Sequence, residues 1–148
     1  MLLRKLVPVF ALSLASAGVS ADRLKPEDAV EYRQSAFRLM SFQLGVLNPL
    51  HRRQAYDDEA FVYRAETLSR LAELALEGFT EDSKGQQSRT QARMWDEREA
   101  FETRLREFAE TTAQMAERSA AGDSRATRDL FRQTLQSCKS CHDRYRIE

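Results

Sequence analysis

Hydrophobic residues recur along the chain at alternating spacings of three and four, which is the pattern of helices with one buried side. Four segments show the pattern, and their inward positions are Val30, Phe37, Met40, Leu44 and Leu47; Phe61, Ala65, Leu68, Ala72, Ala75 and Phe79; Phe101, Leu105, Phe108, Thr112 and Met115; and Thr127, Phe131, Thr134, Cys138, Cys141 and Tyr145. Only five glycines and three prolines interrupt the chain, too few for a β protein of this length. We therefore predict an all-α protein.

Boundary signals place the first three helices. Pro26 suits the first turn of a helix, which we expect to end before Pro49. The second helix is expected to follow the acidic residues 57–59. The third is expected to begin at Asp96, whose side chain would cap the amide of Glu99.

The fourth helix is expected to begin near Asp123 and to run through both cysteines. The connections are short, except for a polar segment over residues 80–91. His51 falls in the first connection and is expected to be exposed. Four helices with mainly short links favour an antiparallel up-down-up-down four-helix bundle, which we assign to residues 22–148.

The first 21 residues have a different character. Basic residues at positions 4 and 5 precede an apolar run over 6–14, and small residues follow at 19–21. This order is typical of a secretory signal peptide. A membrane anchor is the alternative, but Pro8 interrupts the run and the run is short for a bilayer. We predict export to the periplasm and a mature chain that is not inserted in the membrane.

The charge balance bears on the partner. The sequence has 23 Lys plus Arg and 23 Asp plus Glu. Removal of residues 1–21 takes away two basic residues, leaving 23 − 2 = 21 against 23 and a net charge near −2. Such a chain has no general basic field for nucleic acid, and we predict no nucleic-acid partner.

The sequence SCKSCHDRYR at 137–146 holds the only two cysteines, Cys138 and Cys141, followed at once by His142. On a helix, residues three apart project from one face, so both sulfur atoms can bond the vinyl groups of one porphyrin. His142, turned by roughly 100°, can reach the iron. Cys-Xaa-Xaa-Cys-His is the attachment signature of c-type haem, and we predict one covalently bound haem c.

Three other roles are open to the cysteines. A disulfide between residues one helical turn apart would constrain almost nothing. A zinc site would need a further ligand, and His51 is the only other histidine. A thiol oxidoreductase places its cysteines at a helix start, whereas these lie near a helix end. A structural or metal-sensing periplasmic bundle is the function hypothesis without haem.

Arg33 occupies a position on the apolar side of the first helix. A buried arginine keeps its charge and needs an anion nearby, and a haem propionate would serve. The alternative is that Arg33 reaches the end of the bundle or pairs with a glutamate. The neighbouring haem motif favours the propionate.

Taken together, the sequence resembles the cytochromes c′, the four-helix class of c-type cytochromes. The resemblance lies in KPEDAVEYRQSAFRLM at 25–40, QAYD at 54–57, Trp95 and the segment 137–146. It implies thioether bonds to Cys138 and Cys141, with His142 as the proximal iron ligand. It further implies haem-edge or propionate contacts from Arg33 and Gln34, a distal cover by Phe37, and Arg146 beside the proximal face. The segment 80–91 departs from the family pattern, so no haem contact is assigned to Ser88, Arg89 or Thr90.

The distal residue decides the expected chemistry. Low-spin relatives carry a methionine at the place of Phe37, and that methionine ligates the iron. Phenylalanine cannot ligate iron, so we predict a five-coordinate, high-spin centre. Such a centre would bind NO or CO and exchange single electrons with an unidentified redox partner. The alternative is a low-spin, six-coordinate electron carrier, for which Met40 is the candidate ligand. No acid–base group accompanies Phe37, so the protein is not expected to be an enzyme.

A second apolar stripe runs along the first helix. It is formed by Ala29, Tyr32, Ala36, Leu39 and Val46. The stripe is expected to face either a second subunit or a wide core within one chain. The family resemblance favours a homodimer.

Overall fold

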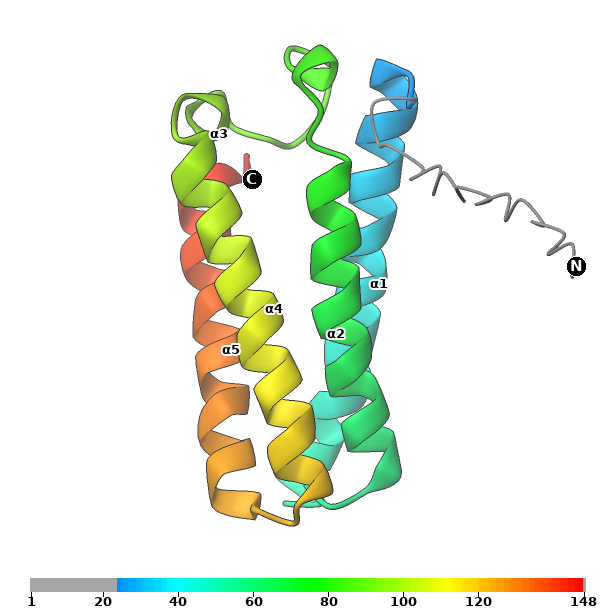
Figure 1. Cartoon of the computed structure of the whole chain (residues 1–148), viewed down its shortest axis with the longest axis vertical. Coiled ribbons are helices and arrows are strands. Elements are labelled where there is room, and N and C mark those ends of the chain that lie inside the picture. The colour runs from blue at the N-terminus through cyan, green and yellow to red at the C-terminus, as the bar shows by residue number, and fades with distance from the viewer. Residues whose placement is uncertain (1–23, 148) are drawn as a thin grey trace, which may run out of the picture.

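The computed structural model describes residues 24–147, and the predicted signal peptide lies outside them. Four long helices dominate: α1 (Pro26–Arg52), α2 (Glu59–Glu77), α4 (Arg98–Ala120) and α5 (Ser124–Tyr145). A 3-10 turn, η2 (Glu81–Ser83), and the short helix α3 (Arg93–Asp96) lie between α2 and α4. Successive long helices run in opposite directions (Figure 1), which confirms the antiparallel four-helix bundle. None of the described helices is both long and apolar enough to span a membrane.

Two helices begin close to the predicted positions, each at an aspartate cap. The Asp58 side chain accepts a hydrogen bond from the amide of Ala60 at 2.8 Å, and α2 follows. The Asp123 side chain accepts from the amide of Ala126 at 3.0 Å at the start of α5. These carboxylates satisfy amides that have no partner within the helix and interact favourably with its dipole.

The predicted end of α1 before Pro49 is wrong, because the helix continues to Arg52. A proline in the last turn removes only one helical hydrogen bond. The amide of Arg53 bonds back to the carbonyls of Pro49 and Leu50, which closes the turn. His51 therefore lies within α1, half-buried rather than exposed, with its Nδ1 atom 2.9 Å from the Tyr56 hydroxyl.

The predicted start of the third long helix at Asp96 is also wrong. Asp96 is the last residue of α3, and α4 begins two residues later at Arg98. Glu97, between them, receives two hydrogen bonds from the Arg144 guanidinium of α5, at 2.7 and 2.8 Å. A contact between helices thus sets this boundary, in place of the local cap expected between Asp96 and Glu99.

The core follows the order of the helices around the bundle. α1 packs on α2, α2 on α4 and α4 on α5. The fourth side is different: α1 and α5 have very few close backbone approaches in the described chain. The rings of His51 and Phe131 join them at one end, with centroids 4.6 Å apart. Toward the other end, these two helices flank a cavity.

Candidate haem-binding site

A cavity of about 450 Å³ lies between α1, α4 and α5, under the segment that joins α2 to α4. Its volume is within the usual range of ligand pockets. Most of its wall is apolar, formed by Phe37, Met40, Leu44, Phe79, Met94, Phe101, Leu105, Phe108 and Tyr145. The same cavity receives all seven predicted site residues: Arg33, Gln34, Phe37, Cys138, Cys141, His142 and Arg146. The fold therefore brings the N-terminal half of α1 to face the haem motif.

The two thiols line the α5 wall. Cys138 and Cys141 are free and half-buried, and they share one face because three residues separate them. Burial raises the pKa of the Cys138 thiol to about 11 and also raises the pKa of Cys141. Redox-active cysteines have lowered pKa values. The environment of this pair is therefore unlike that of a thiol oxidoreductase.

The imidazole of His142 lies at the rim of the cavity and is exposed on its outer side. Its partial burial lowers the pKa of His142, and the neighbouring Arg146 lowers it further. The ring is therefore neutral at physiological pH and has a lone pair that can ligate a metal. Two thiols and one imidazole beside an apolar cavity form the donor set that c-type haem requires.

A zinc site finds no comparable support. Across residues 24–147, His, Cys, Asp and Glu side chains form no cluster of three or more that could ligate a metal. His51, the only other histidine, lies against Tyr56 and Phe131 near the opposite end of α1.

Arg33 is buried at the edge of the cavity, with 2% of its surface exposed. Its Nη1 atom donates to the carbonyl of Gly78 and to Oγ of Ser83, both at 2.7 Å. The guanidinium also lies over the Phe79 ring, 4.6 Å from its centroid. Burial lowers the pKa of Arg33 to about 10, so the group stays charged at neutral pH.

The second nitrogen of this guanidinium indicates that the cavity fits a haem. Nη2 of Arg33 is buried and has no hydrogen-bond partner among the described residues. The predicted alternative of a glutamate partner is not seen, since the partners of Nη1 are neutral. A buried, charged donor without an acceptor is costly. A carboxylate of a haem held by α5 would satisfy it.

Phe37 contributes an aromatic ring to the α1 wall. It is half-buried, and its ring meets Phe79 edge to face with centroids 6.2 Å apart. Met40, one turn further along α1, is buried and also lines the cavity. Gln34 lies on the same wall and is exposed.

Met94 and Arg104 line the cavity although no sequence signal pointed to them, and Arg89 and Thr90, to which no haem contact was assigned, also line it. The segment holding Arg89 is bonded to the chain after α5. The amide of Gln91 donates to the carbonyl of Tyr145, and the amide of Ile147 donates to the carbonyl of Arg89, both at 2.8 Å. No local sequence signal marks this pairing, which forms the bridge between Thr90 and Arg146.

Fold and site together define a four-helix c-type cytochrome. Residues 28–146 match the family model of cytochrome c′, and the chain belongs to this family. Its members carry covalently bound haem c, and the cysteine pair of this chain agrees with that. The chain is 36% identical over 131 residues to the cytochrome c′ of Halomonas halodenitrificans, covering 84% of this chain and 99% of the relative.

The chain is 34% identical over 123 residues to the cytochrome c′ of Alcaligenes xylosoxydans xylosoxydans, covering 82% of this chain and 95% of the relative. Solved structures agree. Cytochrome c prime from Shewanella frigidimarina superposes with a TM-score of 0.74 at 28% identity, covering 83% of this chain and 97% of the other. A nitric oxide complex of an Alcaligenes xylosoxidans variant gives a TM-score of 0.74 at 33% identity, covering 84% and 97%.

Proposed function

We propose that the mature chain is a periplasmic haem protein with five-coordinate, high-spin iron that binds NO or CO and exchanges single electrons. When bound, haem c supplies an iron centre for a diatomic ligand and a one-electron couple. The observation that supports this assignment is the α1 wall, which presents the ring of Phe37 to a largely apolar cavity.

Each site residue has a role in this proposal. Cys138 and Cys141 hold the porphyrin by thioether bonds, and the neutral imidazole of His142 ligates the iron from α5. Arg33 directs its free Nη2 atom to a propionate. Gln34 lies at the haem edge, and Arg146 lies beside His142 on the proximal side.

The distal side determines which ligands enter. Phe37 has no atom that ligates iron, and its ring packs edge to face against Phe79 on that wall. A small, neutral diatomic molecule suits a crowded apolar pocket, and the ring of Phe37 offers no hydrogen bond to bound O₂. The nitric oxide complex of the Alcaligenes xylosoxidans variant supports NO as the ligand.

The alternative is a low-spin electron carrier with both axial positions filled. In this alternative Met40 would be the second axial ligand, because it is buried and lines the cavity from the same helix as Phe37. We favour Phe37 as the distal residue because it lies nearer to Arg33, the proposed propionate contact, by one helical turn.

We assign no catalytic reaction to the site. Proton transfer to a bound peroxide needs a carboxylate or a second imidazole beside the ligand. The cavity wall formed by the described residues includes no Asp or Glu and only one histidine, His142. Reversible ligand binding and electron exchange fit this lining better.

Spectroscopy of the purified, exported protein tests the proposal. We expect haem staining to survive denaturing electrophoresis, and high-spin absorption and electron paramagnetic resonance spectra at neutral pH that change on addition of NO. Low-spin signals in both redox states would establish the six-coordinate alternative. Loss of colour on denaturation would leave only a bundle without covalent haem.

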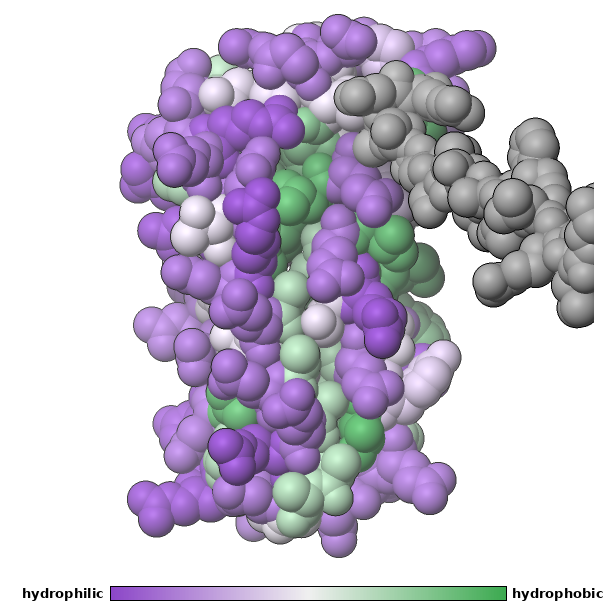
Figure 2. Space-filling model, in the orientation of Figure 1, coloured by the Kyte–Doolittle hydropathy of each residue, from purple (hydrophilic) through white to green (hydrophobic). Residues whose placement is uncertain are grey.

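We also propose a homodimer through the outer face of α1 and α2. Four large apolar side chains are exposed there: Leu39 (51%), Phe42 (62%), Tyr63 (60%) and Leu74 (40%). The guanidinium of Arg64 lies 6.0 Å from the Phe42 centroid and 5.2 Å from that of Tyr63, so the patch continues across both helices. Figure 2 shows hydrophobic surface along the α1 edge.

The predicted stripe is only partly on this face. Ala29 and Ala36 are buried within the chain, whereas Leu39 is exposed, and Phe42 extends the patch. A second copy would bury the patch by two-fold symmetry. Phe42→Glu should then shift sedimentation equilibrium from dimer to monomer, while Ala121→Glu in the exposed α4–α5 turn should leave the mass unchanged. A monomeric parent protein would refute this part of the proposal.

A further inference from the structure

Four arginines surround the mouth of the cavity. Arg38 comes from α1, Arg89 from the segment after η2, Arg104 from α4 and Arg146 from the chain after α5. All four are exposed, and we call them the basic rim. Four separate segments thus place positive charge around one opening, and none of the described residues that line it is acidic.

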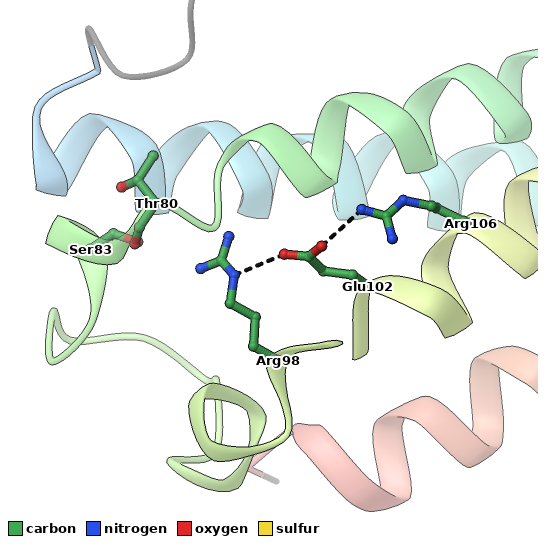
Figure 3. Close-up of polar contacts among 5 residues, drawn as sticks. All are labelled: Thr80, Ser83, Arg98, Glu102 and Arg106. Carbon is green, nitrogen blue, oxygen red and sulfur yellow. Dashed lines mark hydrogen bonds and ion pairs between the residues drawn. The ribbon is translucent and has the colours of Figure 1, made fainter. Parts of the chain in front are cut away.

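Three carboxylates on the helices and turn beside the rim are paired with other residues. Glu102 lies between Arg98 and Arg106, with ion pairs of 2.8 Å to each (Figure 3). Arg104 is two residues from Glu102, about 200° around the helix, and faces the cavity instead. Asp143 and Glu97 are held by Lys139 and Arg144, at 2.6 and 2.7 Å.

The rim itself is not neutralised within residues 24–147. None of its four arginines forms an ion pair there. Arg38 donates to the hydroxyl of Ser35 at 3.2 Å, and Arg89 donates to the carbonyl of Ile147 at 3.1 Å, both neutral acceptors. The chain as a whole has a formal net charge of zero. Positive side chains without an ion pair are therefore gathered at the mouth of a chain whose charges balance overall.

The haem carboxylates do not cancel these positive charges. With Arg33, the cavity and its rim hold five arginines. Two propionates would leave a surplus of 5 − 2 = 3 positive charges. A surplus at the opening attracts an acidic surface over a distance near the Debye length and orients it toward the opening.

We infer that the basic rim is the docking surface for an acidic redox protein that exchanges one electron with the haem. This rests on the proposed haem site. In one direction, one electron leaves the haem iron, which is oxidised, and reduces the redox centre of the acidic partner. In the other direction the partner's centre is oxidised and the haem iron is reduced. No bond is made and no proton moves in either direction. Arginine suits such a contact because its planar guanidinium pairs with carboxylates through two hydrogen bonds.

Small redox reagents of opposite charge test the local field on the holoprotein. The ferrous form would be oxidised by hexacyanoferrate(III), an anion, and by tris(phenanthroline)cobalt(III), a cation. As ionic strength rises from about 10 to about 200 mM, we expect the anion's rate to fall at least about threefold and the cation's rate to rise, because salt screens the rim. Flat or reversed slopes would overturn the inference.

Matched variants locate the effect. Arg38→Gln with Arg104→Gln should reduce the salt dependence of the anion's rate by about half. Arg118→Gln with Arg125→Gln, two exposed arginines near the α4–α5 turn, should leave it unchanged. Equal effects of the two pairs would contradict docking at the rim. Absorption spectra and NO binding on the same samples show whether the haem site itself is intact, so its failure is distinguished from failure of the docking surface.

Binding without electron transfer provides a second readout. Hexacyanochromate(III) is a redox-inert, paramagnetic anion, and it should broaden amide signals of the CO-bound protein around the rim before those near the α4–α5 turn. Polyglutamate should suppress this broadening at concentrations at least about a hundredfold below those of free glutamate, because many carboxylates engage the rim together. Equal potency would identify a site for small anions and reject an acidic protein partner.

Discussion

The Cβ atom of Arg33 lies 2.7 Å from the place that a Cβ atom on Gly78 would occupy, and the carbonyl oxygen of Ala29 lies 2.8 Å from it. α1 and the end of α2 approach so closely here that any side chain at position 78 would force its neighbours to shift. The carbonyl of the same Gly78 accepts a hydrogen bond from Arg33. The close approach thus fixes the arginine that we assign to a propionate.

Gly78→Ala should therefore lower the free energy of unfolding by about 1–3 kcal/mol, because the neighbouring atoms belong to the backbone or are Cβ atoms and cannot move aside cheaply. Gly45→Ala is the matched control. It lies within α1, where an added methyl group would meet no atom within 4 Å, so it should raise stability by about 0.5–1 kcal/mol. Urea unfolding measures the change in unfolding free energy for both variants. If both changes had the same sign, the packing described around Gly78 would be contradicted.

Replacement of Arg33 should affect both the fold and the haem. Arg33→Leu leaves the Gly78 carbonyl without its donor and should cost about 1–3 kcal/mol of stability. It also removes a positive charge near the proposed haem. Loss of that charge stabilises the oxidised form of the haem and therefore lowers its reduction potential. Arg33→Lys retains the charge and should keep the potential closer to that of the parent. Potentiometric titration measures the reduction potential of each protein. Equal potentials in the parent and both variants would show that Arg33 does not lie close to the haem.

The distal assignment predicts a change of coordination. Phe37→Met should supply a sixth ligand and convert the spectrum from high-spin to low-spin, because the thioether would replace the ring above the iron. Leu44→Met introduces the same group two turns further along the cavity wall and should leave the iron five-coordinate. If Phe37→Met leaves the absorption spectrum unchanged, Phe37 does not cover the distal face.

A pH dependence follows from His51. Burial lowers the pKa of His51 below its ordinary value of 6.5, and Arg132, Arg128 and Arg52 lower it further. The unfolded state then binds the proton more readily, so this group's contribution to stability falls as pH drops from above 6.5 through the folded pKa. His51→Gln should flatten this part of the curve between about pH 7.5 and about pH 5. Urea unfolding at each pH measures it, and parallel curves would exclude the linkage.

The helices were predictable because their apolar positions follow the helical period over several turns of chain. Their ends were predictable only where a local cap decides them, as at Asp58 and Asp123. Pro49 was misleading, since the turn after it is closed by backbone bonds and by packing of His51. Asp96 was misleading because Glu97 is held by Arg144, a residue 47 positions away.

The site residues likewise fall into those that the sequence could identify and those that it could not. The thiols and His142 could be identified because their spacing carries the chemistry, and Arg33 because a charge interrupts an apolar face. Arg89 and Arg104 could not, since their segments meet at the cavity only in the folded chain. The same holds for Ser83, which bonds Arg33 from 50 positions away. Three members of the basic rim, Arg38, Arg89 and Arg104, are of this second kind, and the zero net charge of the sequence gives no sign of them.

The ring contact between His51 and Phe131 also has a mechanical meaning. With few other close approaches between α1 and α5 in the described chain, this contact closes the bundle between them at one end. Phe37 lies fourteen residues away along α1, or about 21 Å at 1.5 Å per residue. The cavity wall that carries Phe37 is thus held mainly by packing of α1 on α2, so loss of that packing would widen the cavity on the α1 side.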